Sequence, residues 1–323
     1  MRRWLGIMLV FSLVAGVASG CRQSKPLEKE TPAKEVEIPE EIFQGKNMEP
    51  QLRVYLATED SVVTMAMEDY IMGVVAAEMD PNWPLAALAA QAIEARTFTL
   101  QKIAEQGTLP GRDAHASTNI EEFQAYDPSR INDNVREAIN NTRGLAAVYQ
   151  GEFVRGWFHA YCGGITATPT AGLNFQGEAP PYCRPVENPC RDYVDDEIKF
   201  WSKTFSKSQI RSAVTTIAKE DPGDFPSIEI AEAENGRAVS FKVGQVQVPA
   251  AELRLALGST EMRSTWVEPP SISGDEVKFI GRGYGHGVGL CQWGAKGWGE
   301  EGRSAEEIVK AFFPGVSIQK LWD

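Results

Sequence analysis

The chain has 323 residues, and domains commonly hold about 100–200 residues, so the length allows two ordinary domains or one large domain with an extension. Hydrophobic residues make up 43% and charged residues 24%, a globular composition that excludes a collagen-like or wholly disordered chain. The formal net charge is −12, from 32 basic and 44 acidic residues. This balance argues against nucleic acid as a partner, because phosphate binding needs a basic surface.

The first twenty residues have the layout of a secretory signal. Arg2 and Arg3 precede an almost entirely apolar run, residues 4–17, which is shorter than the ~20 residues that span a bilayer. Small residues then lead directly to Cys21, an order similar to a bacterial lipobox. We therefore predict a signal peptide over 1–20, a lipid on Cys21 and an extracytoplasmic, membrane-anchored lipoprotein, with plain secretion as the alternative.

The remainder of the chain divides into a tether and a folded unit. Residues 21–50 are rich in Lys, Glu and Pro with little periodicity, which predicts a flexible linker before a single domain over 51–323. Apolar alternation predicts a hairpin over 52–56 and 61–65.

Helices and further strands follow the hairpin. Helical spacing predicts helices over 67–79 and 85–106, the second beginning after Pro84 and ending before Gly107. Later patterns predict strands over 147–149 and 152–161, a helix over 206–219, a hairpin over 228–230 and 238–243, a strand over 276–280 and a helix over 305–313. Clusters of strands and helices without strict alternation indicate an α+β fold, a single large catalytic domain of mixed helices and antiparallel strands.

The helix predicted over 67–79 carries glutamates at opposite ends. Glu68 lies at the N-terminus, where the helix dipole stabilises a carboxylate, so we interpret it as a first-turn acid. Glu78 lies at the C-terminus beside apolar residues, where the dipole and desolvation both raise a carboxyl pKa. A glutamic acid that stays protonated is what a general acid for glycosidic-bond cleavage requires, although an exposed Glu in a solvated last turn fits the same pattern.

Residues 281–297 alternate glycine with polar and aromatic residues. No placement satisfies the G-x-G-x-x-G fingerprint, so a Rossmann phosphate site is excluded. Glycines let the backbone approach a ligand closely, and groups suited to a sugar come from Tyr284, His286, Gln292 and Trp293. The alternative is a tight structural turn with a satisfied histidine.

The internal cysteines allow three interpretations. His159 and Cys162 have the H-x-x-C spacing of metal ligands, and Cys183 and Cys190 would complete a tetrahedral zinc site. In an exported protein Cys183 could equally pair with Cys190, or Cys162 with Cys291, in disulfides. A Cys162 nucleophile served by a histidine is the third interpretation, without an orienting residue that the sequence identifies.

Taken together, these segments resemble the stage II sporulation protein D (SpoIID/LytB) family, whose members act on peptidoglycan. The matching stretches, in family order, are residues 68–79, 84–97, 159–164, 253–258, 262–264 and 283–295. Two departures stand out. Phe123 lies where many relatives carry a Cys or His-Cys pair, which weakens the metal interpretation, and Asp80 adds a charge near Glu78.

The resemblance implies a lytic transglycosylase fold and activity. Such an enzyme cleaves between N-acetylmuramic acid and N-acetylglucosamine in glycan strands, preferably strands stripped of stem peptides. The family's catalytic glutamate maps onto Glu78, in agreement with the dipole argument. Substrate contacts are expected from Gln91, Arg96, Tyr284, His286, Gln292 and Trp293. No cofactor is expected for the chemistry; some members bind zinc through His and Cys, which makes a structural zinc a candidate at His159, Cys162, Cys183 and Cys190.

Under this hypothesis Glu78 protonates the glycosidic oxygen and then takes the proton from the muramoyl C6 hydroxyl, which attacks C1 of the same sugar. A rival hypothesis is a non-catalytic, glycan-binding lipoprotein that activates an N-acetylmuramoyl-L-alanine amidase, since some relatives are described as amidase enhancers. A Cys/His peptidase is a third. The expected partners are peptidoglycan strands, the membrane through Cys21 and, in the rival hypothesis, an amidase. Family membership does not distinguish sporulation from vegetative wall remodelling.

Overall fold

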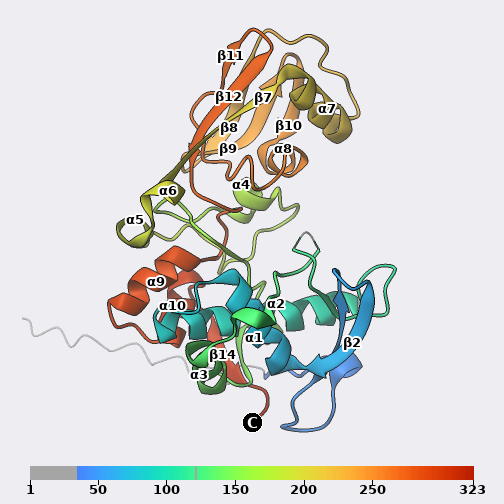
Figure 1. Cartoon of the computed structure of the whole chain (residues 1–323), viewed down its shortest axis with the longest axis vertical. Helices are drawn as coiled ribbons and strands as arrows, with labels where there is room; N and C mark the ends of the chain where they lie inside the picture. Colours follow the sequence, from blue (N-terminus) through green and yellow to red (C-terminus); the bar gives the residue numbers. More distant parts are fainter. Residues whose placement is uncertain (1–34, 121) are drawn as a thin grey trace, which may run out of the picture. The chain divides into compact units, whose positions relative to one another are not determined.

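The computed structural model describes residues 35–120 and 122–323, so the predicted signal peptide and Cys21 lie outside the described residues. The described residues form one compact unit. Helices and small, mostly antiparallel sheets are mixed along the chain, which confirms the predicted α+β class (Figure 1). Within this part of the chain, no helix has both the length and the apolar character needed to cross a membrane.

The elements follow one another irregularly. The α-helices are α1 (Met67–Glu78), α2 (Leu85–Gln106), α3 (Asp133–Asn141), α4 (Pro169–Leu173), α5 (Cys190–Tyr193), α6 (Asp196–Lys199), α7 (Lys207–Ala218), α8 (Ala250–Ala256), α9 (Gln292–Glu300) and α10 (Ala305–Phe312). The strands are β1 (Gln51–Leu56), β2 (Ser61–Ala66), β3 (Ala116–Ser117), β4 (Leu145–Tyr149), β5 (Glu152–Phe153), β6 (Phe158–His159), β7 (Phe200–Ser206), β8 (Ile228–Glu234), β9 (Arg237–Val243), β10 (Val246–Pro249), β11 (Ser271–Ser273), β12 (Glu276–Arg282), β13 (Leu290–Cys291) and β14 (Ser317–Lys320). Two short 3-10 helices are η1 (Glu40–Ile42) and η2 (Pro128–Arg130).

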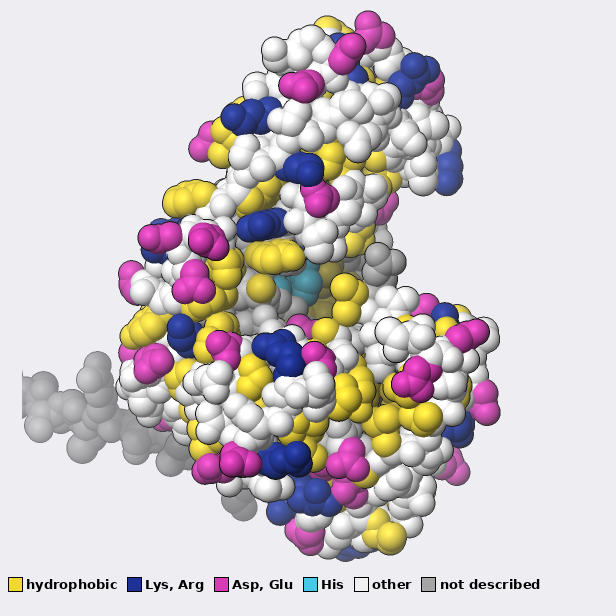
Figure 2. Space-filling model, in the orientation of Figure 1, with side chains coloured by type: hydrophobic (Ala, Val, Ile, Leu, Met, Phe, Trp, Pro, Cys, Tyr) yellow, Lys and Arg dark blue, Asp and Glu magenta, His cyan; other side chains and the backbone are white. Residues whose placement is uncertain are grey.

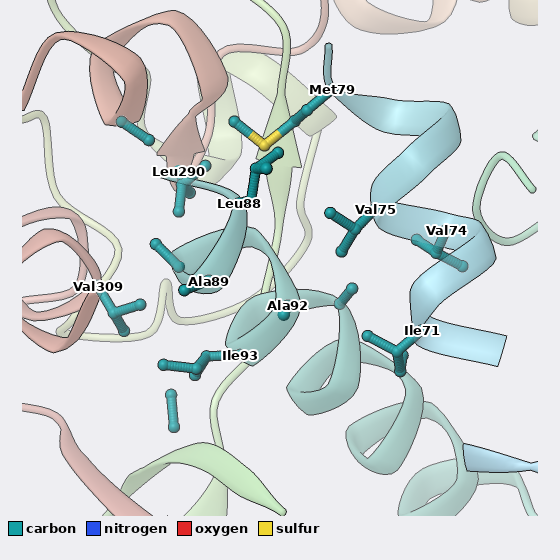
Figure 3. Close-up of a cluster of buried hydrophobic side chains, with 14 of the residues drawn as sticks. Ile71, Val74, Val75, Met79, Leu88, Ala89, Ala92, Ile93, Leu290 and Val309 are labelled. Carbon is teal, nitrogen blue, oxygen red and sulfur yellow. The ribbon is translucent and has the colours of Figure 1, made fainter. Parts of the chain in front are cut away.

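The first of two hydrophobic cores surrounds α2. This helix starts after Pro84 and ends at Gly107, as predicted, and it packs against α1, α3, α9, α10 and β4. Ile71 and Val75 of α1 lie next to the small side chain of Ala92 on α2 (Figure 3). Small residues let neighbouring helices approach closely, so α2 becomes the central support from which the ends of α1 and α9 are positioned.

The second core lies among β7 to β12, α7 and α8, which Figure 1 shows gathered together. Two three-stranded sheets, in the orders β11-β12-β7 and β10-β9-β8, supply most of its side chains. The turn between β8 and β9 consists of Asn235 and Gly236, with φ values of 49° and 81°. Two positive φ angles suit a two-residue hairpin turn, so the predicted hairpin is confirmed.

Two predicted segments differ in the structure. The strand expected over 152–161 is broken into β5 and β6, because at Gly156 the chain passes over α2: a Cβ there would lie 2.7 Å from the Glu94 carbonyl oxygen. The glycine-rich stretch over 281–297, whose glycines suit a loop or a tight turn, is instead helical from Gln292 onward, in α9. Glycines at 294 and 297 sit where a Cβ would meet Asn188 and Tyr193, respectively, so close packing rather than flexibility explains them.

The predicted linker is wrong over its last residues. Ile42 is only 1% exposed in the first core. The backbone of Val36 exchanges two hydrogen bonds with the Gln319 side chain, at 3.0 and 2.8 Å, and Glu49 forms an ion pair with Arg143. Residues 35–50 therefore belong to the folded unit, because their side chains cover apolar surface that a flexible tether would leave open to water.

Glu94 of α2 is a buried carboxyl group that lowers the stability of the fold as pH rises. Neither of its oxygens has a hydrogen-bond partner among the described residues, and burial raises the pKa of this carboxyl from 4.5 to about 8. In the folded protein it therefore stays protonated up to pH 8, whereas in the unfolded chain it ionises near pH 4.5. Stability from this group is fully present below pH 4.5 and is lost as pH rises to 8.

Glu94→Gln should remove that loss, because the amide is neutral at every pH. We expect the variant to match wild type at pH 4 and to be more stable by several kcal/mol at pH 9, measured by denaturant unfolding at both pH values. Glu105→Gln, on the exposed end of the same helix, is the matched control and should change stability by less than about 0.5 kcal/mol. Parallel pH profiles for wild type and Glu94→Gln would contradict the assignment.

Candidate functional site

Glu78 is the last residue of α1 and is half-buried. Its Oε1 accepts a hydrogen bond from the Ala125 backbone N–H at 3.0 Å, and its Oε2 accepts one from the Gln292 side-chain amide at 3.3 Å. Burial raises the pKa of Glu78, and the two hydrogen bonds, which favour the carboxylate, partly oppose that rise. The result is a carboxyl biased toward its protonated form that still has two groups ready to stabilise its anion.

The segment around Ala125 is held against α1 by close packing. The Asp127 N–H donates to the Gly73 carbonyl at 3.0 Å, and a Cβ at Gly73 would lie only 2.2 Å from the Tyr126 ring. The helix therefore needs glycine at this position. Arg130, just beyond this segment, donates to the Ala77 and Met79 carbonyls at 3.1 and 3.3 Å and so satisfies the C-terminal end of α1. The sequence interpretation missed these supports, because the Ala125 donor is a backbone N–H without a residue-type signal and Arg130 lies 53 residues from Ala77 along the chain.

Gln292 begins α9 and is followed by Trp293, which is 6% exposed. The Trp293 ring packs against Trp83, with centroids 4.6 Å apart and planes tilted by 58°. The Lys296 ammonium lies 4.5 Å from the centroid of Trp293 and 5.3 Å from that of Trp83. Of the predicted substrate residues, Gln292 contacts Glu78 directly. Trp293 follows it on α9 and packs with Trp83 and Lys296, two residues that the sequence interpretation did not select.

The glycine-rich turn before α9 holds His286 in a fixed state. Gly285 and Gly287 have φ of 102° and 84°, in the region that favours glycine. The Nδ1 of His286 accepts the Val288 N–H at 3.1 Å, so its Nε2 carries the proton and donates to the Phe158 carbonyl at 2.8 Å. Burial lowers the pKa of His286, which keeps the ring neutral. Both ring nitrogens are already used, so the expectation that His286 hydrogen-bonds a sugar is wrong.

Tyr284 lies in the same turn, where its backbone pairs with Tyr161 in both directions at 2.7 and 2.9 Å. Its ring is half-buried, and the Arg263 guanidinium lies 5.4 Å from the ring centroid. Figure 2 shows a hollow on this face of the molecule, with a histidine side chain at its floor and Lys or Arg side chains above and below it. Aromatic rings with nearby polar groups suit a sugar ligand, so Tyr284 remains a candidate contact.

Two other predicted substrate residues are buried inside the first core. Arg96 is fully buried and forms an ion pair with Glu68, with Nη2 to Oε2 at 2.5 Å and Nε to Oε1 at 3.1 Å. Gln91 has no exposed surface, and neither amide atom has a partner among the described residues. The expectation that Arg96 and Gln91 line an open groove is therefore wrong, because neither side chain reaches the surface.

A cluster of sulfur and imidazole groups lies behind the turn. The ligand atoms of His159, Cys162 and Cys291 all lie within 4.8 Å of one another, and the Cys190 sulfur is 3.4 Å from that of Cys162. Within residues 35–120 and 122–323, all four cysteines are buried free thiols. The structure therefore gathers Cys291, rather than the predicted Cys183, with His159, Cys162 and Cys190.

Cys183 has a different environment. Burial and the nearby Glu94 raise the pKa of its thiol to about 12, and its sulfur is not among the ligand atoms that gather at His159, Cys162 and Cys291. At the cluster, burial alone would raise the pKa of Cys162, but the neighbouring side chains of Cys190, Cys291 and His159 outweigh it and lower that pKa. Position rather than thiol pKa separates Cys183 from the cluster, because the pKa values of Cys190 and Cys291 are raised as well.

The cluster fits a metal in its chemistry. His159 Nδ1 lies 3.1 Å from the Val288 carbonyl, to which it donates, leaving a buried Nε2 that has no hydrogen-bond partner among the described residues. Arg237 is 1% exposed, and its Nη2 donates to the Cys162 carbonyl at 2.5 Å. Three thiolates and a divalent cation leave one negative charge, which this buried guanidinium would balance.

The structure is that of an α+β protein with a half-buried glutamate held by a backbone N–H and a glutamine amide. The sequence profile of the family described as Stage II sporulation protein matches residues 55–149. An uncharacterized protein of Brachyspira hyodysenteriae is 31% identical over 78% of this chain and 66% of its own length. From Bacillus subtilis, the amidase enhancer is 28% identical over 77% of this chain and 40% of its own, and stage II sporulation protein D is 26% identical over 83% and 78%.

The chain belongs to the SpoIID family. It spans 66% of the length of the Brachyspira relative and 40% of the length of the amidase enhancer. The profile match covers α1, α2 and the segment that contacts Glu78. It includes the matching stretches 68–79 and 84–97, whereas the other four stretches lie beyond it.

Proposed function

We propose that the protein is a peptidoglycan lytic transglycosylase in which Glu78 is both general acid and general base. The observation that carries the proposal is the state of Glu78: a half-buried carboxyl with a raised pKa, held by two N–H donors, one of them from Gln292 at the start of α9. Membership of a family that includes stage II sporulation protein D supports a cell-wall role outside the cytoplasm. Lipid anchoring at Cys21 is part of the same proposal.

In the proposed reaction, protonated Glu78 gives its proton to the glycosidic oxygen as the bond from that oxygen to muramoyl C1 breaks. The resulting Glu78 carboxylate takes the proton of the C6 hydroxyl of the same sugar, whose oxygen forms the new bond to C1. Ala125 and Gln292 stabilise the carboxylate between these two transfers. Because the nucleophile comes from the substrate, one carboxylate suffices where hydrolytic glycosidases use two.

Product analysis tests this reaction. Glycan strands freed of stem peptides are incubated with the protein, and the fragments are separated and weighed by mass spectrometry. We expect fragments whose terminal muramoyl residue carries an intramolecular 1,6-anhydro ring. Each such fragment is lighter by one water than the corresponding hydrolysed fragment. Fragments that carry ordinary reducing ends would instead identify a hydrolase, and intact strands would remove the catalytic proposal.

The amidase enhancer among the relatives favours a second candidate function. In it, the protein binds glycan without cutting it and activates an N-acetylmuramoyl-L-alanine amidase. The two candidates separate cleanly, because amidase activation would persist in Glu78→Gln, whereas strand cleavage would not.

We also propose a structural zinc at His159, Cys162, Cys291 and Cys190, where it would stabilise the turn that leads to α9. Protein prepared without chelator is expected to contain about one zinc per chain. Cys291→Ser should lose this metal and unfold at lower temperature, while Cys183→Ser, a buried cysteine outside the cluster, should keep it. Elemental analysis and thermal unfolding provide the two readouts, and a metal-free wild type with full stability would overturn the proposal.

A further inference from the structure

Lys296 is a cation beside the site with an unusual environment. It lies one helical turn after Gln292 on α9, and residues four apart share one face of a helix, about 5–6 Å apart. Gln292 contacts Glu78. Lys296 therefore lies on the same face of α9 as Gln292, the residue that contacts Glu78. Its half-buried ammonium lies over the rings of Trp83 and Trp293.

No carboxylate lies within 4 Å of this ammonium in the part of the chain that the structure describes. The other nearby cations are already occupied. Arg130 donates to two carbonyls at the end of α1, and Arg263 donates to the Glu197 carbonyl at 3.4 Å. In a chain with net charge −12, a half-buried lysine without an acidic partner is a place where an external anion gains more than it does elsewhere on the surface.

The two indoles keep the ammonium in place without using its hydrogens. An aromatic face attracts the charge but accepts no conventional hydrogen bond, so the three N–H donors of Lys296 stay available to a ligand. Because the side chain is already held by the rings, less rotational freedom is lost when a ligand binds. The same rings offer stacking surface to a sugar, so this arrangement fits a ligand that is both saccharide and anion.

We propose that Lys296 recognises the carboxylate of a muramoyl residue and so selects strands whose stem peptides are absent. The inference rests on the proposed function. A muramic acid carries a lactyl group whose carboxyl is a free anion without the peptide and a neutral amide with it. Lys296 would pair with the anion and gain nothing from the amide, which makes it a specificity-determining residue rather than a catalytic one.

The experiment compares binding to two strands with a protein that does not cut. Glu78→Gln protein is titrated with peptide-free glycan strands, and with the same strands after their muramoyl carboxyls are converted to methylamides. We expect about 10- to 100-fold tighter binding to the acid strand. Lys296→Met should remove this preference by weakening acid-strand binding alone, and Lys296→Arg should restore most of it. Lys207→Met is the matched control, because Lys207 also lies over an aromatic ring, Phe225, but in the second core.

Each outcome decides something. Equal binding of both strands, or a preference that survives Lys296→Met, overturns the role of Lys296 and leaves the proposed function standing. Absence of binding to either strand overturns the glycan function itself, and this inference with it. Loss of binding to both strands equally in Lys296→Met marks a structural effect and also overturns the inference.

Discussion

Glu78→Gln is expected to reduce the rate of strand cleavage by about 10³-fold, since general acid–base catalysis contributes roughly 10²–10⁴-fold and glutamine can neither give nor take the proton. The amide keeps the shape of the side chain, so the fold should be unaffected. The rate is measured as the appearance of anhydro ends. Asp80→Asn is the matched control, because it removes an exposed charge two residues away and should leave the rate within about twofold.

The pH profile adds a test that a structural role for Glu78 would fail. A general acid must be protonated, so cleavage should fall as pH rises through the raised pKa of Glu78. The Gln292 amide favours the carboxylate form, and Gln292→Leu removes that support. The pKa of Glu78 should then rise further, and the falling limb of the profile should move to higher pH. An unmoved limb, or one displaced to lower pH, would contradict the assignment.

Glu68→Gln is expected to lower the free energy of unfolding by about 3–5 kcal/mol, because it leaves Arg96 charged and buried without its partner. Glu68 also accepts hydrogen bonds from the Gly144 N–H and the Trp322 indole, both at 3.0 Å, so one carboxylate ties α2 to the chain's C-terminal end. The change is measured by chemical denaturation at neutral pH.

Replacing both partners provides the control. In Glu68→Met with Arg96→Met no charge is left buried, so the double variant should recover part of the stability that either single change loses. A single variant within about 0.5 kcal/mol of wild type would show that water reaches the pair. If Arg96 instead binds substrate, its replacement should weaken glycan binding in protein that remains folded, which the buried position argues against.

Local signals predicted the elements that lead to the site. The β1–β2 hairpin, α1 and α2 follow from periodicity and from Pro84 and Gly107 at the ends of α2, because these signals act within a few residues. The position of Glu78 at the end of α1 followed from the same pattern. What surrounds it did not, since the Ala125 donor is backbone and Gln292 is far along the chain.

Long-range partners explain the predictions that were wrong. Arg96 is a residue type that suits glycan binding, but in the fold its guanidinium is paired with the Glu68 carboxylate. Cys183 matches the spacing of the cluster in sequence, but Glu94 rather than the other sulfurs is its neighbour. Residues 35–50 have the composition of a tether, yet Ile42 is buried. For Arg96 and Cys183 the residue type attracted attention correctly, but the neighbour that occupies it lies tens of residues away in the sequence and was not predicted.

The glycines of α9 have a consequence for how the protein reaches its active form. Glycine costs a helix about 1 kcal/mol relative to alanine, and α9 contains Gly294, Gly297 and Gly299 in nine residues. Such a segment has little tendency to coil alone, so its helix depends on the surfaces around Pro84, Asn188 and Tyr193 that its glycines fit. Gln292 can therefore reach Glu78 only after distant parts of the chain have docked. A partly folded chain would hold the Glu78 carboxyl without the Gln292 amide, so this pair forms only in the completed fold.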